Sequence, residues 1–82
     1  MYPNPVMNNI VTVGFNLIDI KNIFYRVIDL NGRVVLTGRY ANWYDTKFTI
    51  NFNKMNLSDG LYMLEVNYDD KYRSVNKFVL LN

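Results

Sequence analysis

The hydrophobic positions of the chain alternate with a period of two in several short stretches. Such alternation is typical of a β-strand that buries one face. Residues 9–17 place on one face Val11, Val13, Phe15 and Leu17. Residues 46–52 and 61–68 do the same, with the apolar faces Phe48, Ile50 and Phe52, and Tyr62, Leu64, Val66 and Tyr68. We predict further strands at 23–30, 33–37 and 72–81, since these are also rich in β-branched and aromatic residues.

Turn signals separate these stretches. Asn31-Gly32 is the strongest short hairpin signal, and we expect both of its residues to take positive φ. Gly38 is expected to end the returning strand, and Asp69-Asp70 to form the last turn. Residues 53–60 read as a connection that Leu57 anchors.

No stretch of ten or more residues shows helical spacing with caps. Short strands with turns every eight to twelve residues are typical of a sandwich or a small barrel, and the lack of crossover helices favours antiparallel pairing. We therefore predict one all-β domain over residues 1–82, an Ig-like antiparallel β-sandwich of about seven short strands.

Composition narrows the classes of function. Half of the 82 residues are hydrophobic and 16% are aromatic, so the chain should fold. The net charge of +2 comes from scattered residues, and the absence of a basic stripe argues against a nucleic-acid partner. The longest apolar runs, such as 78–81, are far shorter than the roughly 20 residues of a membrane helix.

The sequence nominates no catalytic centre. It contains no histidine and no cysteine, which removes the commonest general base and the thiolate ligands of zinc. Side chains of the adjacent Asp69 and Asp70 should diverge, while Asp29 and Asp59 sit beside glycine turns, where aspartate bonds the local backbone. There is no glycine-rich phosphate loop and no calcium-loop spacing. We expect neither an enzyme nor a cofactor.

An aromatic segment, residues 39–45, has no clear periodicity and is expected to be a loop or a short irregular strand. Tyr40, Trp43 and Tyr44 occur there with arginine and asparagine, a composition that suits a sugar-stacking platform or a protein contact. Trp43 could instead plug an open end of the sandwich, and we favour this plug.

Four short motifs, in the same order and spacing, resemble the type A C-terminal sorting domain of the type IX (Por) secretion system. Together they cover nearly the whole chain, and the last one ends at its terminus. They are Tyr2-Pro3-Asn4-Pro5, Asp29-Leu30-Asn31-Gly32-Arg33-Val34-Val35, Leu57-Ser58-Asp59-Gly60-Leu61-Tyr62 and Lys77-Phe78-Val79-Leu80. The last hairpin departs from the family pattern, since Asp69-Asp70-Lys71 stands where relatives often have a glycine.

Local chemistry accounts for part of these motifs. Pro3 and Pro5 keep the entry segment extended, and Gly32 and Gly60 suit turns that a Cβ would obstruct. Tyr62 is expected to bury its ring and to bond a backbone partner through its hydroxyl. Lys77 alternates with Val75 and Val79, so it either snorkels to solvent or belongs to an outward face that a partner reads.

The resemblance implies a C-terminal fragment of a larger secreted protein that acts as its export address. The partners implied are the outer-membrane translocon and shuttle proteins of the type IX system, followed by a surface sortase that usually removes the domain and attaches the cargo to lipopolysaccharide. The location implied is the periplasm in transit, then the cell surface or the medium. The motif residues implied in recognition are Pro3, Asn4, Pro5, Asp29, Gly32, Arg33, Gly60, Tyr62, Lys77 and Val79.

Two other functions stay open. The chain could be an Ig-like carbohydrate-binding or adhesion module, with Trp43 and Tyr44 as the stacking surface, or a passive spacer of a surface protein. Unprotected strand edges also make a homodimer conceivable.

Overall fold

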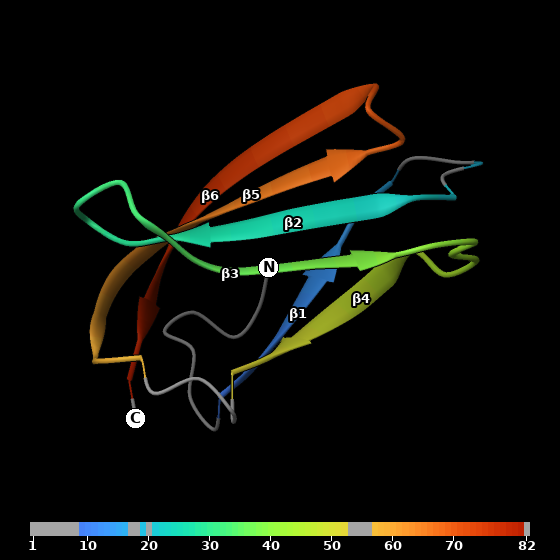
Figure 1. Cartoon of the computed structure of the whole chain (residues 1–82). Helices are drawn as coiled ribbons and strands as arrows, with labels where there is room; N and C mark the ends of the chain where they lie inside the picture. The colour runs from blue at the N-terminus through green and yellow to red at the C-terminus, as the bar shows by residue number, and fades with distance from the viewer. Residues whose placement is uncertain (1–8, 17–18, 20, 53–56, 82) are drawn as a thin grey trace.

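The structure is a computed structural model that describes residues 9–16, 19, 21–52 and 57–81. These residues form six strands and no helix (Figure 1). The strands are β1 (Ile10–Gly14), β2 (Ile23–Ile28), β3 (Val34–Tyr40), β4 (Lys47–Asn51), β5 (Gly60–Tyr68) and β6 (Tyr72–Leu80). The described residues therefore include no helix long and apolar enough to cross a membrane.

The strands make two antiparallel sheets. One sheet contains β1 and β4, and the other has the strand order β3-β2-β5-β6. The two sheets lie over one another as layers, with the four-stranded sheet uppermost in Figure 1. The predicted all-β antiparallel sandwich is confirmed, with six strands in the described part of the chain.

The core lies between the two layers and includes most of the alternating residues that the sequence singled out. Among the described residues thirteen apolar side chains are almost fully buried, including Val11, Val13, Phe48, Ile50, Phe52, Tyr62, Leu64, Val66 and Tyr68, whereas Phe15 is only partly buried. Aromatic pairs join the layers, since Phe52 stacks on Phe78 with ring centroids 5.9 Å apart and Phe15 lies 4.9 Å from Tyr68. Burying this much apolar surface is the main stabilising contribution in so small a domain.

The expectation that Gly38 ends the third strand is wrong. β3 continues through Gly38 to Tyr40, so Arg39 and Tyr40 belong to a strand and not to a loop. Gly38 is the cross-strand partner of Tyr25, and the tyrosine ring covers the space where a Cβ at residue 38 would stand. A glycine covered by a neighbouring aromatic ring keeps its place in a strand.

The expected geometry at Asn31-Gly32 is also wrong in part. A hairpin forms there, closed by hydrogen bonds from Gly32 N to Asp29 O (3.0 Å) and from Asp29 N to Arg33 O (2.9 Å). Gly32 has φ +80°, whereas Asn31 is not among the described residues with positive φ. The loop is thus three residues long, with glycine alone in the left-handed region.

Two consecutive residues with positive φ, which we expected at Asn31-Gly32, occur instead in the last turn. Asp69 and Asp70 both have φ 55°, and Lys71 N donates to Tyr68 O at 2.9 Å. Asp69 compensates for the conformation by accepting hydrogen bonds from Asn22 N (2.7 Å) and Lys21 N (3.2 Å) through its carboxylate. The turn without glycine is therefore tied to the connection between β1 and β2.

Candidate functional site

The second motif folds into the β2–β3 hairpin by bonding to itself. One carboxylate oxygen of Asp29 accepts hydrogen bonds from Asn31 N (2.9 Å) and Arg33 N (3.0 Å), and the other accepts one from Arg33 Nε (3.1 Å). The backbone N–H of Arg33 is the main reason that the pKa of Asp29 lies below its ordinary 3.8. Aspartate, glycine and arginine of this motif thus build a turn, as aspartate and glycine commonly do.

The third motif forms a corner at the start of β5. Gly60 takes φ +151°, and the Tyr62 hydroxyl donates to Ser58 O at 2.6 Å. Only 6% of Tyr62 is exposed, and its ring stacks on Phe78. A tyrosine that bonds the backbone a few residues upstream is the tyrosine corner of Ig-like sandwiches, and the expectation for Tyr62 is confirmed.

The fold brings these two motifs together with the fourth. Residues of the hairpin and of the corner line one surface hollow, which includes Asp29, Arg33, Ser58 and Tyr62. In the β5–β6 ladder Gly60 pairs with Leu80, Leu61 with Val79, and Met63 with Lys77. Three motifs that are separate in sequence therefore share one end of the four-stranded sheet. We call this end, formed by residues 29–35, 57–62 and 77–81, the motif end.

The motif end exposes apolar surface. Leu30 is 75% exposed, and Val34, Leu61, Val79 and Leu81 are each between 36% and 42% exposed. The Arg33 side chain and Lys77 lie exposed beside them. Apolar side chains next to cations at a surface are typical of a protein contact.

The structure separates the motif residues by what they do. The side chains of Asp29 and Arg33, the positive φ of Gly32 and Gly60, and the buried hydroxyl of Tyr62 all serve folding. Lys77 and Val79 are exposed on β6. Pro3, Asn4 and Pro5 lie outside the described residues.

Sequence reasoning did not single out Leu30, Leu61 and Leu81 as surface residues of the motif end. A single exposed leucine carries no signal until the fold groups it with others.

The outer face of the four-stranded sheet carries a bonded cluster of charges beside the motif end. Glu65 is only 8% exposed although it points away from the core. Arg26 donates to its Oε1 through Nε (3.0 Å) and Nη2 (2.7 Å), and Arg73 donates to its Oε2 through Nη2 (2.7 Å). The hydrogen bond from Arg73 contributes most to lowering the pKa of Glu65.

The aromatic segment lies against the core at one end of the sandwich. Trp43 packs on Tyr40 with ring centroids 4.5 Å apart, and its indole N–H donates to Lys47 O at 2.9 Å. Its backbone N–H donates to Lys21 O at 2.8 Å, while the Tyr40 hydroxyl donates to Thr49 O at 2.7 Å. These contacts support the plug interpretation; Tyr44, 94% exposed, is the one of the three aromatic residues left to solvent.

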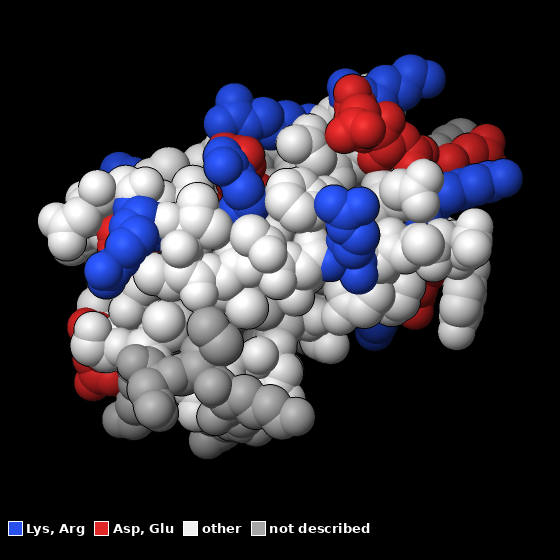
Figure 2. All heavy atoms as spheres, in the orientation of Figure 1, with Lys and Arg blue, Asp and Glu red and all other residues white. Residues whose placement is uncertain are grey.

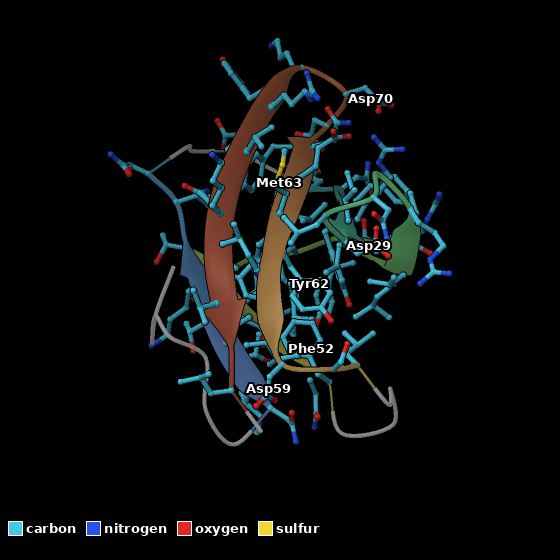
Figure 3. All side chains as sticks on the ribbon, turned by 90° about the vertical axis from the view of Figure 1, so that its left-hand side faces the viewer. Asp29, Phe52, Asp59, Tyr62, Met63 and Asp70 are labelled. Carbon is cyan, nitrogen blue, oxygen red and sulfur yellow. The ribbon has the colours of Figure 1, made fainter. Side chains whose placement is uncertain are left out.

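Three aspartates of the described residues lie at different places on the surface. Asp59 and Asp70 lie at opposite ends of the molecule (Figure 3), whereas Asp29 and Asp59 line the same surface hollow. No group of three or more acidic residues within the described part of the chain is arranged to hold a metal ion. The Asp29 carboxylate at that hollow is engaged by its hydrogen bonds to Asn31 and Arg33.

These observations define the chain as a compact Ig-like β-sandwich whose sequence motifs meet on one exposed end. It matches the family of secretion system C-terminal sorting domains over residues 1–81, and it belongs to that family. No curated protein and no solved structure matches it significantly. The family is one of type IX export signals and not of enzymes, and it implies export to the cell surface or the extracellular space.

Proposed function

We propose that this domain is the C-terminal address of a larger secreted protein, read through its motif end by the outer-membrane translocon and shuttle proteins of the type IX system. The cargo crosses the periplasm and reaches the cell surface or the medium. A surface sortase then removes the domain and attaches the cargo to lipopolysaccharide, as is usual in this family. The whole of residues 1–82 acts as one unit.

One observation carries this proposal: three family motifs converge on an end whose apolar and cationic side chains are exposed. Asp29, Gly32, Arg33, Gly60 and Tyr62 build this end, and Lys77 and Val79 present the surface that the receptor contacts. The distinction is physical, because a side chain consumed by internal hydrogen bonds has little left to offer a partner. Pairing of two copies through open strand edges, and sugar binding at Trp43 and Tyr44, stay predictions from the sequence.

Export of a fused reporter tests the proposal. Residues 1–82 are placed behind a folded periplasmic reporter in a bacterium with an active type IX system and, as a control, in the same strain lacking the translocon. We expect surface or extracellular reporter in the first strain only. A passive spacer or an adhesion module would leave the reporter in the periplasm of both strains, and that result would end the assignment.

The role of Lys77 is tested with a matched pair of charge reversals. Lys77→Glu alters β6 at the motif end, and Lys47→Glu makes the same change in net charge on β4. We expect export to fall about tenfold or more for Lys77→Glu and to stay near the parent level for Lys47→Glu, with both variants folded by near-ultraviolet circular dichroism. Equal export by the two variants would remove Lys77 from the recognition surface.

A further inference from the structure

The outer face of the four-stranded sheet combines apolar side chains with an excess of positive charge. We define this outer face by the cations Arg26, Arg39, Arg73 and Lys77, the anion Glu65, and the apolar residues Phe24, Ile28, Val34, Leu61, Met63, Val75 and Val79. Cross-strand pairing sets Ile28 between Val34 and Met63, and Met63 next to Lys77. Figure 2 shows several Lys and Arg side chains over the part of the molecule occupied by this sheet.

The charges of the outer face are held in place. Both carboxylate oxygens of Glu65 are taken, one by Arg26 and the other by Arg73. The side chains of Arg26 and Arg73 are 37% and 62% exposed, and each guanidinium has N–H donors beyond those that bond Glu65. A guanidinium fixed in this way binds a carboxylate at a lower entropic cost than a free lysine does.

We infer that the outer face docks onto an acidic, partly apolar surface of a protein, and that it extends the contact made by the motif end. The inference rests on the proposed function and deepens it by assigning the chemistry of the receptor. Four cations share this face with one internally bonded anion, so a partner that brings negative charge would match them. Val34, Leu61, Lys77 and Val79 belong to both surfaces, which makes the two continuous.

A protein suits the outer face better than an anionic membrane does. Its exposed aliphatic residues Val34, Leu61, Val75 and Val79 are each 36% to 43% exposed and lie flat on a sheet. Its aromatic residue Phe24 is half-buried, with the Arg39 guanidinium 5.2 Å from its ring centroid. Surfaces that enter a lipid headgroup layer project long or aromatic side chains and carry mobile lysines. The fixed guanidinium pair instead matches the planar carboxylates of Asp and Glu.

The sign of the charge is tested at two matched threonines. Thr37 is exposed on β3 and faces Arg26 across the strands, and Thr49 is exposed on β4 of the other sheet. Each is changed to Glu and to Lys in the exporting reporter fusion. Binding is measured to outer-membrane vesicles from the competent strain and, separately, to liposomes made from the lipids of those vesicles.

On the vesicles, we expect Thr37→Glu to weaken binding about fivefold at low salt and Thr37→Lys to keep or tighten it. The difference in binding between the two Thr37 variants should shrink at 0.5 M salt, and both Thr49 variants should bind as the parent does.

Equal losses of binding for Thr37→Glu and Thr37→Lys would show a steric effect and overturn the inference. So would unchanged binding by both, or parent binding to the lipid liposomes that equals binding to the vesicles. If the parent fusion is not exported at all, it is the proposed function that fails.

Discussion

Tyr62 shows how a single family-motif residue can be explained by folding. Its hydroxyl donates to Ser58 O at 2.6 Å inside a nearly buried corner, and its ring packs on Phe78. The corner fixes the direction in which the chain enters β5, and hence the register that places Lys77 beside Met63. In the function that we propose, this motif residue therefore acts indirectly, through the fold that displays other residues.

Replacing Tyr62 with Phe tests this role. We expect a loss of about 1–2 kcal/mol in the free energy of unfolding, because Ser58 O loses its buried donor while the ring stays in place. Urea denaturation followed by circular dichroism measures it. The control is Tyr44→Phe, at a residue 94% exposed, which should change stability by less than about 0.5 kcal/mol. A Tyr62→Phe domain as stable as the parent would contradict the corner.

Gly38 provides a second test at the scale of one residue. A Cβ at this position would overlap the ring of Tyr25, which packs between the sheets on Phe48 with centroids 6.0 Å apart. We expect Gly38→Ala to destabilise the domain by about 1–3 kcal/mol, since the ring must leave its packed position. Gly14→Ala is the matched control, because nothing lies within 4 Å of its Cβ position, and it should be close to neutral. Thermal denaturation compares the two variants, and equal melting temperatures would show that the ring adapts freely.

At the scale of elements, the last hairpin depends on contacts with a distant segment. The Asp69 carboxylate accepts from the backbone of Lys21 and Asn22, and Asp69 N donates to Asn22 O at 2.8 Å. The β5–β6 turn and the connection into β2 are thus one unit, although 47 residues separate Asp69 from Asn22. This explains how the turn dispenses with the glycine that relatives often have there.

The pair Asp69→Ala and Asp70→Ala isolates that contact. Both aspartates have φ 55°, so each substitution places alanine in the same unfavourable conformation. Only Asp69→Ala also removes the bonds to residues 21 and 22, and we expect it to be less stable than Asp70→Ala by about 1–2 kcal/mol. Hydrogen exchange at Asn22 N should accelerate in the Asp69 variant alone. Similar stabilities and exchange rates would mean that the turn geometry dominates.

At the scale of the whole molecule, carboxylates bonded in the folded state link stability to pH. The pKa of Glu65 is lowered chiefly by Arg73, and that of Asp29 chiefly by the backbone of Arg33. A carboxyl group with a lowered folded pKa stabilises the fold above its unfolded pKa, and this contribution disappears as the pH falls through the folded pKa. For Glu65 the contribution is complete above its ordinary value of 4.5 and is lost below it.

We therefore expect the domain to lose stability as the pH falls from about 5 to 2, and Glu65→Gln to flatten part of that loss. At pH 7 the variant should be about 1–2 kcal/mol less stable than the parent, since two arginines lose their anion while remaining partly solvated. Urea midpoints at several pH values measure both effects. A variant whose midpoint falls with pH as steeply as that of the parent would exclude Glu65 from the acid transition.

The class of fold and the family can be predicted from the order of the amino acids alone. Alternating residues such as Val11, Val13, Phe48 and Ile50 can bury one face only as strands, so the core followed from the pattern. The motifs at 29–35 and 57–62 identified the family because their turns depend on contacts within a few residues.

Features that depend on residues remote in sequence became apparent in the folded arrangement of the strands. Gly38 stays in a strand because Tyr25 covers it, and Asp69 tolerates its conformation because residues 21 and 22 bond to it. The motif end and the outer face likewise arise from the order of β3-β2-β5-β6, which sets side by side residues that no local pattern connects. Pairing between distant strands is settled by the packing of the whole core, and a period-two pattern records which face is buried but not which strand is the neighbour.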